Sequence, residues 1–516
     1  MEETQTHHAS SRAEWILLLS FASLKLLVQL AGIQGYGYFR DEFYYLACSG
    51  QLDFGYVDHP PFSIWMLAGV RAVLGDSLVA LRLIPALAGA AAVLLTGLIA
   101  RRLGGGLIAQ ALAMSALLAS PLYLALHHVY SMNSLDILFW ALSAYLLVRI
   151  LQGSPPQLWL LLGAVLGLGL QNKISLLWLG TGLLLGLLLT PQRRWLRTPW
   201  PWAAGAIALF VFSPHLIWQA AHGWPSLEFI RNATNFKMAD ISILDFLSGL
   251  VRSMNPVTVP IWLAGLYFFF ARPEGKPYRM LGWIFVTVFL LLALSGSSRV
   301  SYMAPAYTWV LAAGGVAIGF WIEKGSRPWL RAGPVFALLA AGGLMMAPLG
   351  MPLLPVESYV SYSQALGIQP STAERKELAE LPQFYADMHG WDEIVSTVAK
   401  VYNSLSVADQ KKAGIFTPNY GLAGAIDLLG SRMGLPPAIS GHNNYWLWGP
   451  RHYTGEVMIM LGWSRQDLEE VFEVVGRVTV TRCSYCMPYE NNNPIWLCRN
   501  MRRPLEEVWP ELKHYD

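Results

Sequence analysis

The chain has 516 residues, of which 54% are hydrophobic and only 13% are charged. In a typical soluble domain about a quarter of the residues are charged, so this composition excludes an ordinary soluble protein and indicates a membrane protein. The formal net charge of +3 is too small to indicate a nucleic-acid partner, and the sequence has no basic run that would support one.

Apolar segments of about the 20 residues needed to cross a bilayer recur through the first two thirds of the chain. We expect about 11 spans, at residues 14–33, 78–100, 106–126, 134–151, 157–172, 174–190, 200–218, 247–271, 280–296, 302–322 and 332–350. The first segment is too long for the hydrophobic region of a signal peptide and lacks an obvious cleavage site, so we interpret it as a retained helix.

The basic residues of the loops predict the orientation. If the N-terminus is cytoplasmic, every even-numbered connection is basic, as the positive-inside rule requires. These connections hold Arg101 and Arg102; Arg193, Arg194 and Arg197; Arg272, Lys276 and Arg279; and Lys324, Arg327 and Arg331. We therefore expect a multi-pass protein of the inner (plasma) membrane whose first loop and C-terminal third lie outside the cytoplasm.

The C-terminal third has a different character. From Pro355 the sequence is polar, and helix-like stretches at 391–405 and 422–434 alternate with strand-like stretches at 414–417, 456–461 and 471–480. This alternation predicts a small α/β or α+β domain. We expect a polytopic α-helical membrane domain over residues 1–353 and a soluble extracytoplasmic domain over residues 354–516.

Three of the four cysteines, Cys483, Cys486 and Cys498, fall in this domain. The Cys-x-x-Cys pair is typical of a disulfide in an oxidising compartment, but half of a metal site or no special role are alternatives. Zinc would need a fourth ligand, and no histidine follows Cys498 at a standard spacing. The remaining cysteine is either unpaired or bonded to Cys48.

The first predicted loop gathers carboxylates at a membrane face. Asp41 and Glu42 are adjacent, and Asp58 and His59 begin an Asp-His-Pro-Pro turn among several tyrosines. A solvated loop is the alternative, but this grouping favours a reaction site at the boundary of water and lipid. Our candidate catalytic residues are Asp41, Glu42, Asp58 and Asp136, although Asp136 has the alternative of capping the fourth predicted span.

Polar residues at the ends of other spans are predicted on the same side of the membrane. Such residues are costly at membrane depth and are usually functional. We predict that Lys173, Arg299 and Tyr302 bind a donor phosphate. Predicted substrate contacts are Tyr44, Tyr45, His59, His128, Asn133, Trp218 and His222. For Lys173 and Arg299, the alternative to phosphate binding is that a long basic side chain at a helix end simply reaches the membrane surface. For the tyrosines and tryptophans, the alternative to substrate contact is an aromatic belt at the membrane interface.

This set of residues indicates sugar transfer. Lysine and arginine hold phosphate, and a carboxylate can take the proton of an attacking hydroxyl. Nucleotide-activated sugars are not supplied outside the cytoplasm, so the donor would be a lipid-linked sugar phosphate. A single displacement would invert the anomeric centre. No cofactor is certain, and the need for a divalent metal ion is left open.

Several motifs carry a resemblance to a known family. They are Arg40-Asp-Glu-Phe-Tyr-Tyr45, Tyr56-Val-Asp-His-Pro-Pro61, Asn133-Ser-Leu-Asp136, Gln171-Asn-Lys173, Pro214-His-Leu-Ile-Trp218 with His222-Gly-Trp-Pro225, and Ser298-Arg-Val-Ser-Tyr302 with Pro305. The chain resembles, over about residues 15–320, the GT-C membrane glycosyltransferases, in particular the group of bacterial protein O-mannosyltransferases and lipid A aminoarabinose transferases (glycosyltransferase family 39).

The resemblance implies a GT-C fold and a polyprenyl-phosphate sugar donor, with a protein, lipid or glycan as acceptor. It further implies that Asp41 is the base or orients the acceptor, and that Lys173 and Arg299 bind the lipid phosphate. The domain after residue 354 matches no part of the better-known relatives. A lipid or glycan transporter is the alternative, but its polar residues would lie near the bilayer midplane, often in two related halves.

Overall fold

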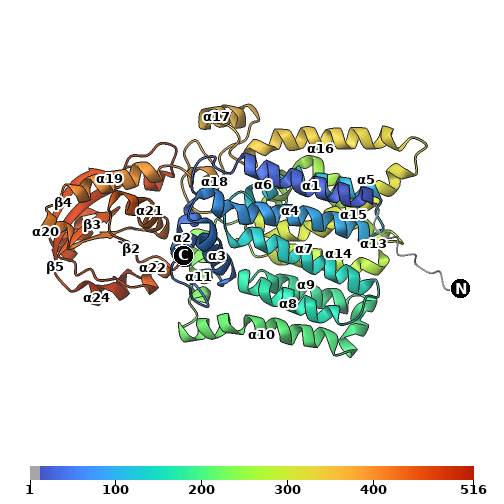
Figure 1. Cartoon of the computed structure of the whole chain (residues 1–516), viewed down its shortest axis with the longest axis horizontal. Helices are drawn as coiled ribbons and strands as arrows, with labels where there is room; N and C mark the ends of the chain where they lie inside the picture. The colour runs from blue at the N-terminus through green and yellow to red at the C-terminus, as the bar shows by residue number, and fades with distance from the viewer. Residues whose placement is uncertain (1–11) are drawn as a thin grey trace. The chain divides into compact units, whose positions relative to one another are not determined.

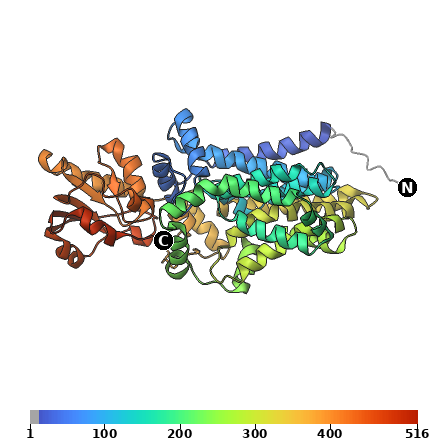
Figure 2. The same ribbon diagram turned by 90° about the horizontal axis from the view of Figure 1, so that it is seen from below.

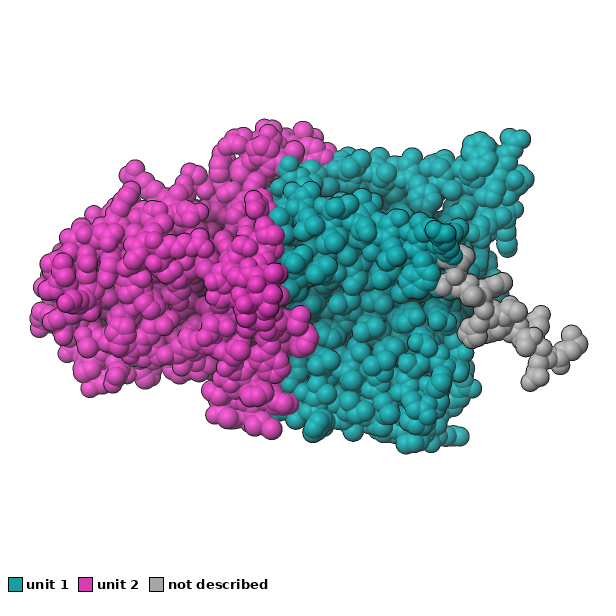
Figure 3. All heavy atoms as spheres, in the orientation of Figure 1, with its two compact units in different colours: residues 1–33, 82–213, 240–353 teal, residues 34–81, 214–239, 354–516 magenta. Residues whose placement is uncertain are grey.

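The computed structural model describes residues 12–516, and it is mostly helical with one C-terminal sheet (Figure 1). The chain divides into two compact units (Figure 3). Unit 1 comprises Met1–Ile33, Arg82–Ser213 and Asp240–Leu353. Unit 2 comprises Gln34–Leu81, Pro214–Ala239 and Leu354–Asp516. The first loop and the C-terminal domain therefore belong to the same unit.

Unit 1 is built from apolar helices, which run alongside one another in both ribbon views (Figures 1 and 2). They are α1 (Arg12–Ala31), most of α4 (Leu78–Arg102), α5 (Leu107–Leu118), α6 (Pro121–Leu126), α7 (Met132–Leu151), α8 (Leu158–Asn172), α9 (Leu176–Leu188), the first part of α10 (Trp200–Ala221), α12 (Ile243–Ser253), α13 (Val259–Ala271), α14 (Arg279–Ala293), α15 (Ala304–Glu323) and α16 (Pro328–Gly350). Each predicted span has a helix, or a pair of helices, at its position.

Within residues 12–516, seven helical segments are long and apolar enough to cross a bilayer, and the bent pair α12 and α13 makes up to eight. The chain is thus a polytopic helical membrane protein. Two of the predicted spans are shorter helices, because α8 has 15 residues and α9 has 13. The structure therefore does not reach the predicted number of about 11 by the criterion of length.

The segments predicted as spans at 106–126 and 247–271 are each broken into two helices. The second of these segments bends by 92° between α12 and α13. Asn255 has a positive φ of 71° at the bend and Pro256 follows it, so the helical hydrogen-bond ladder is interrupted. The first segment breaks between α5 and α6, where Pro121 starts the new helix. Hydropathy does not report such bends.

Glycines bring α13 and α15 into close contact. A Cβ atom at Gly265 would collide with the carbonyl oxygen of Val310, and one at Gly314 would collide with that of Ile261. Small residues at such crossings let two helix backbones approach, which is how membrane helices gain packing energy without a hydrophobic driving force.

Unit 2 contains short helices and one sheet. The segments from the first two thirds of the chain form α2 (Arg40–Ser49), α3 (Phe62–Leu74), the end of α10, and α11 (Pro225–Asn232). The C-terminal segment adds α17 (Val356–Ala365), α18 (Gln383–Ala386), α19 (Trp391–Asn403), α20 (Val407–Gln410), α21 (Tyr420–Leu429), α22 (Asn444–Leu447), α23 (Arg465–Val471) and α24 (Leu505–Val508).

The sheet has the order β2-β1-β3-β5-β4. Its strands are β1 (Ala413–Phe416), β2 (Ala438–Ile439), β3 (Val457–Leu461), β4 (Phe472–Val480) and β5 (Pro494–Met501). β1 pairs in parallel with β2 and β3, whereas β5 is antiparallel to β3 and β4. The predicted strands correspond to β1, β3 and β4, and the sequence analysis missed β2 and β5. β2 has only two residues, and a proline and three asparagines obscure the start of β5.

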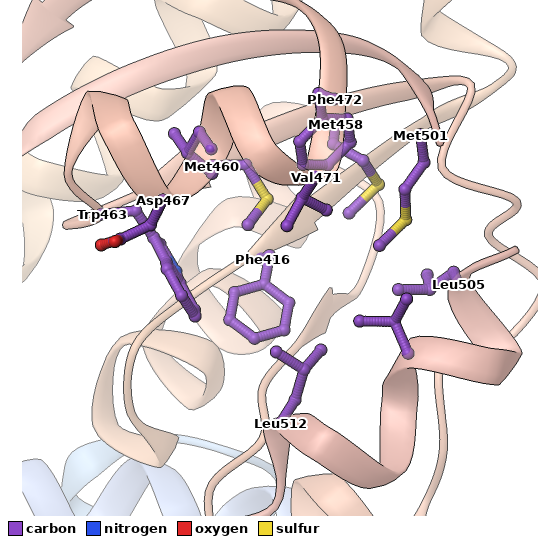
Figure 4. A pocket seen from close by; sticks show the side chains of 12 residues that line it. Phe416, Met458, Met460, Trp463, Asp467, Val471, Phe472, Met501, Leu505 and Leu512 are labelled. Atoms are coloured by element: carbon purple, nitrogen blue, oxygen red, sulfur yellow. The ribbon is translucent and has the colours of Figure 1, made fainter. Parts of the chain in front are cut away.

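The core of this domain contains a small apolar cavity (Figure 4). It lies among side chains of β1, β3, α23 and α24, including Phe416, Met458, Met460 and Leu505. Its volume is about 40 Å³, which is too small for a sugar ring or an acyl chain. We therefore interpret it as a packing gap of the core.

The cysteines follow the expected pattern. Cys483 and Cys486 form a disulfide. Cys48 and Cys498 are both buried and unbonded, so the alternative of a bond to Cys48 does not hold in this structure.

Candidate active site

The two adjacent carboxylates of α2, Asp41 and Glu42, differ in burial and in hydrogen bonding. Glu42 is fully buried, and its Oε2 accepts a hydrogen bond of 2.8 Å from the backbone N–H of Phe39. This is the contact of a helix-capping glutamate. Asp41 is only half-buried and does not serve as a cap. The geometry thus gives Glu42 a structural contact and leaves Asp41 open to a ligand.

Asp41 is held by a tyrosine of the C-terminal domain. The Tyr420 hydroxyl, at the start of α21, donates a hydrogen bond of 2.9 Å to Asp41 Oδ1. Among residues 12–516, the other oxygen of Asp41 has no hydrogen-bond partner. Burial raises the pKa of the Tyr420 hydroxyl well above its usual value, so this group stays protonated and donates. One carboxylate oxygen is therefore fixed, and the second remains available to accept a proton.

Asp58 is held in the same manner by Tyr44. The Tyr44 hydroxyl lies 2.8 Å from Asp58 Oδ1 and 2.9 Å from Asn444 Oδ1. Since a hydroxyl has one proton, these two acceptors compete for it, and the carboxylate is the stronger partner. Asn444 Oδ1 also accepts the backbone N–H of Val57 at 2.8 Å, which fixes the turn that carries Asp58.

The two tyrosines are in contact with each other. The ring centroids of Tyr44 and Tyr420 are 4.6 Å apart with an interplanar angle of 30°. Tyr44 and Tyr420 each bind one carboxylate, so the first-loop residues Asp58 and Asp41 lie beside the same tyrosine pair.

His59 is buried among tyrosines. Its ring stacks on Tyr45 at 4.8 Å and lies 5.0 Å from the ring of Tyr56. Its Nε2 is 3.9 Å from Asp58 Oδ1. Tyr44, Tyr45 and His59 are each less than 5% exposed, so Asp58 is next to a buried aromatic cluster. Their predicted contact with substrate stays a prediction.

Arg40 places a buried cation beside this pair. Its Cζ lies 5.0 Å from the centroid of Tyr420 and 5.5 Å from that of Tyr489, and its Nη1 donates to the Tyr489 hydroxyl at 2.7 Å. The backbone N–H of Arg40 donates to the carbonyl of Asp387 at 2.9 Å. Burial raises the pKa of the Asp387 carboxyl to about 7, although the positive charge of Arg40 opposes this shift.

Trp218 and His222 lie at the end of α10, within unit 2. Their rings stack at 4.2 Å, and His222 Nδ1 donates to the carbonyl of Trp218 at 2.8 Å. Trp218 is buried against Gly55, whose missing side chain leaves room for the indole. His222 is exposed and remains available to a ligand.

Unit 1 holds a second cluster, centred on Lys173. Lys173 Nζ donates to Asn133 Oδ1 at 2.7 Å and lies 3.6 Å from Asp136 Oδ2. Asp136 Oδ1 accepts a hydrogen bond of 2.6 Å from Ser175. The buried Asp136 is therefore the counter-ion of Lys173. A phosphate bound at Lys173 would interact with an ammonium group that also pairs with the Asp136 carboxylate.

Tyr302 belongs to this second cluster. Lys173 Nζ lies 4.7 Å from the centre of the Tyr302 ring, a cation–π distance. Arg299 is half-buried, and its carbonyl accepts the backbone N–H of Tyr302 at 3.0 Å. His128, another predicted contact residue, is buried elsewhere in unit 1, with its Nε2 3.1 Å from Arg82 Nη1.

Comparisons with known proteins show what this chain is similar to. A family profile described as dolichyl-phosphate-mannose-protein mannosyltransferase matches residues 58–218. The lipid A galacturonosyltransferase RgtD of Rhizobium johnstonii is 25% identical over 342 residues, which are 64% of this chain and 70% of the relative.

The fold also has solved relatives. The structure of ArnT from Cupriavidus metallidurans bound to undecaprenyl phosphate gives a TM-score of 0.62 at 14% identity, covering 94% of this chain and 98% of that one. The arabinofuranosyltransferase AftD from Mycobacteria gives 0.52 at 14% identity, covering 95% of this chain and 40% of that one. The chain is a membrane glycosyltransferase with the GT-C fold.

One group of side chains in the C-terminal domain has the residue types of a metal site. Among residues 12–516, one group could bring three ligands together, because the ligand atoms of His442, His514 and Asp516 lie within 4.8 Å of one another. However, His442 Nδ1 accepts the backbone N–H of Tyr420, so the proton is on Nε2, the nitrogen that faces Asp516. The two imidazoles are also stacked face to face. This arrangement does not fit a metal site.

Sequence reasoning missed the part of the site that the C-terminal domain supplies. Tyr420, Asn444 and Asp387 all contact the first loop or its tyrosines. The available signal was the polar run Gly441-His-Asn-Asn444 between apolar stretches. The sequence alone gave no reason to connect that run with a loop about 400 residues earlier.

Proposed function

We propose that this GT-C transferase moves a sugar from a polyprenyl-phosphate-linked donor to an acceptor hydroxyl on a protein, lipid or glycan, with inversion at the anomeric carbon. Asp41 is the general base. The observation that carries this assignment is the position of its carboxylate, with one oxygen fixed by Tyr420 and the other unpaired at a half-exposed position.

The reaction balances without a further reactant. The acceptor hydroxyl attacks the anomeric carbon while Asp41 takes its proton, and the bond from that carbon to the phosphate oxygen breaks. The polyprenyl phosphate leaves with the electron pair. Phosphate is a good leaving group, so this scheme needs one carboxylate base and not the acid–base pair of a glycoside hydrolase.

The relatives support the choice of donor. ArnT from Cupriavidus metallidurans is described with undecaprenyl phosphate, and the matching family profile is named for dolichyl-phosphate-mannose. In this chain, Lys173 with Tyr302, together with Arg299, would bind the phosphate. These relatives are transferases, and none of them favours the transporter alternative.

We place the reaction on the outer face of the cytoplasmic membrane, with a cytoplasmic N-terminus and an extracytoplasmic C-terminal domain. The basic even-numbered connections support this orientation. The predicted cytoplasmic end of the chain, residues 1–11, lies outside the described residues.

The test is transfer by the purified protein in detergent or nanodiscs, with radiolabelled polyprenyl-phosphate sugars as donors. Mass spectrometry of the envelope lipids, glycans and proteins of a deletion strain identifies the acceptor. A component that loses one sugar residue in that strain is the expected result. Unchanged envelope components and no transfer from any lipid-linked donor would refute the proposal.

A further inference from the structure

His442 lies directly behind the tyrosine that holds Asp41. It is 3% exposed, in the segment between β2 and α22. Its Nδ1 accepts the backbone N–H of Tyr420 at 3.4 Å, and its Nε2 donates to the backbone carbonyl of Asp516 at 2.9 Å. Both ring nitrogens are therefore engaged with the backbone, which fixes the tautomer and the ring orientation.

The ring of His442 also contacts two other aromatic rings. Its centroid is 4.6 Å from that of Tyr420 and 4.6 Å from that of His514. The backbone of Gly441–Asn443 pairs with the C-terminal segment 513–516, called the tail below, which carries His514. The N–H of His514 donates to the carbonyl of Gly441 at 3.0 Å, and the N–H of Asn443 donates to the carbonyl of His514 at 3.1 Å.

The tail is anchored in turn to α11. Lys513 Nζ forms an ion pair of 2.7 Å with Glu228 Oε2. Asn232 Nδ2 donates to the carbonyl of Tyr515 at 2.9 Å. Contacts within unit 2 thus run without a break from α11, through the tail and His442, to Tyr420 and Asp41.

We propose that His442 is a positioning residue for the transfer reaction, which fixes Tyr420 and through its hydroxyl sets the orientation of Asp41. The proposal rests on the function proposed above. The ring of Tyr420 packs against the rings of both His442 and Tyr44, and these contacts restrict its rotation. Without His442, the backbone N–H of Tyr420 loses its acceptor and the ring loses one of its aromatic contacts.

The expected loss is in the chemical step. Displacement of a catalytic group by about 1 Å costs on the order of 10²-fold in rate. His442→Leu should therefore lower kcat by about 10- to 100-fold and leave the KM for the lipid-linked donor nearly unchanged. His442→Asn should lose less, because an asparagine Oδ1 can still accept the N–H of Tyr420.

A double-mutant cycle separates positioning from a general loss of structure. If His442 acts through the Tyr420 hydroxyl, His442→Leu should cost little in a Tyr420→Phe background. Equal losses in both backgrounds would overturn the proposal, as would an unchanged kcat or a change confined to KM. His452→Leu is the control, since His452 is exposed and its ring contacts Tyr453.

A second measurement does not depend on activity. Hydrogen exchange of the amides of α2 should become faster in His442→Leu and in His442→Asn, but not in His452→Leu. Unchanged exchange in both His442 variants would overturn the positioning assignment even if no donor is found. Failure of the wild type to transfer sugar, with faster exchange in α2, would instead refute only the proposed reaction.

Discussion

Asp41 and Tyr420 are 379 positions apart in the chain, and their side chains are joined by a hydrogen bond of 2.9 Å. Asp41 belongs to the first loop between apolar segments, and Tyr420 starts a helix of the C-terminal domain. Both residues are in unit 2, so the domain after residue 354 contributes to the site that the first loop begins.

Removing the basicity of Asp41 should abolish most of the transfer. Asp41→Asn keeps the size of the side chain and an acceptor for the Tyr420 hydroxyl, so folding and donor binding should persist. Loss of a general base typically costs about 10²- to 10⁴-fold in rate. Purified variants assayed with a lipid-linked sugar measure this loss as kcat.

Glu42→Gln is the matched control for Asp41→Asn. A glutamine keeps an oxygen that can accept the N–H of Phe39, so the cap of α2 should survive and the loss of rate should be milder. If Asp41→Asn transfers sugar at nearly the normal rate while Asp58→Asn or Asp136→Asn is inactive, the base is one of those two residues.

The fold could be predicted from the sequence wherever hydropathy alone decides. Long apolar runs located the helices of unit 1, and a change of composition at Pro355 located the start of the last segment of unit 2. The 92° bend at Asn255 and Pro256 could not be predicted from hydropathy, because both arms of the bend are apolar. β5 was missed because its residues show no clean alternation.

The sequence pointed only to the first-loop part of the candidate site. The adjacent carboxylates Asp41 and Glu42 and the Asp-His-Pro-Pro turn indicated that loop, and in the structure Asp41 and Asp58 contact the same tyrosine pair. Only the family resemblance favoured Asp41 over Glu42, since local sequence does not show which of the two side chains caps α2. Tyr420 and Asn444 could not be found, because local composition does not reveal tertiary contacts between residues that are far apart in the sequence.

Changing Lys173 should weaken donor binding. Lys173→Met keeps the length of the side chain but removes the charge, and a hydrogen bond to a charged group contributes about 1.5–3 kcal/mol, or roughly 10- to 100-fold in affinity. The measurement is the Kd for undecaprenyl phosphate, together with the KM for the donor. Arg299→Ala should act in the same direction.

The buried ion pair with Asp136 requires its own control, because Lys173→Met leaves that carboxylate unpaired. The double variant Lys173→Met with Asp136→Asn removes both charges and should restore stability without restoring donor binding. If the double variant binds undecaprenyl phosphate like the wild type, Lys173 is only the counter-ion of Asp136 and the phosphate site lies elsewhere.

Reporter fusions test the orientation. A fusion after Arg194 should report a cytoplasmic position, because Arg194 lies in one of the basic connections. A fusion after Pro370 should report an external position. An external signal after Arg194 would invert the topology and place the first loop, with Asp41, on the cytoplasmic side.

The cysteines test the compartment of the C-terminal domain independently. Disulfides persist outside the cytoplasm and are rare inside it. When the protein is denatured directly from cells, an alkylating reagent should modify only Cys48 and Cys498, and reduction should expose Cys483 and Cys486 as well. Mass spectrometry counts the modified thiols. Four reactive thiols without reduction would contradict an oxidising compartment.

Asp387 should make stability depend on pH. Burial raises the pKa of this carboxyl in the folded protein from 3.8 to about 7. Between these two values the folded state binds more protons than the unfolded state, so this group lowers stability as the pH rises from about 4 to about 7 and adds no further change above that range. The buried carboxylate is the unfavourable form.

Asp387→Asn removes this titration while it keeps an acceptor for the Tyr489 hydroxyl. The variant should therefore gain thermal stability relative to the wild type as the pH rises from about 4 to about 7. Unfolding temperatures in detergent, measured at intervals over this range, give the difference, and Asp392→Asn on the exposed start of α19 controls for the loss of one charge. A difference that stays constant with pH would show that Asp387 does not titrate in this window, and that Arg40 keeps it ionised.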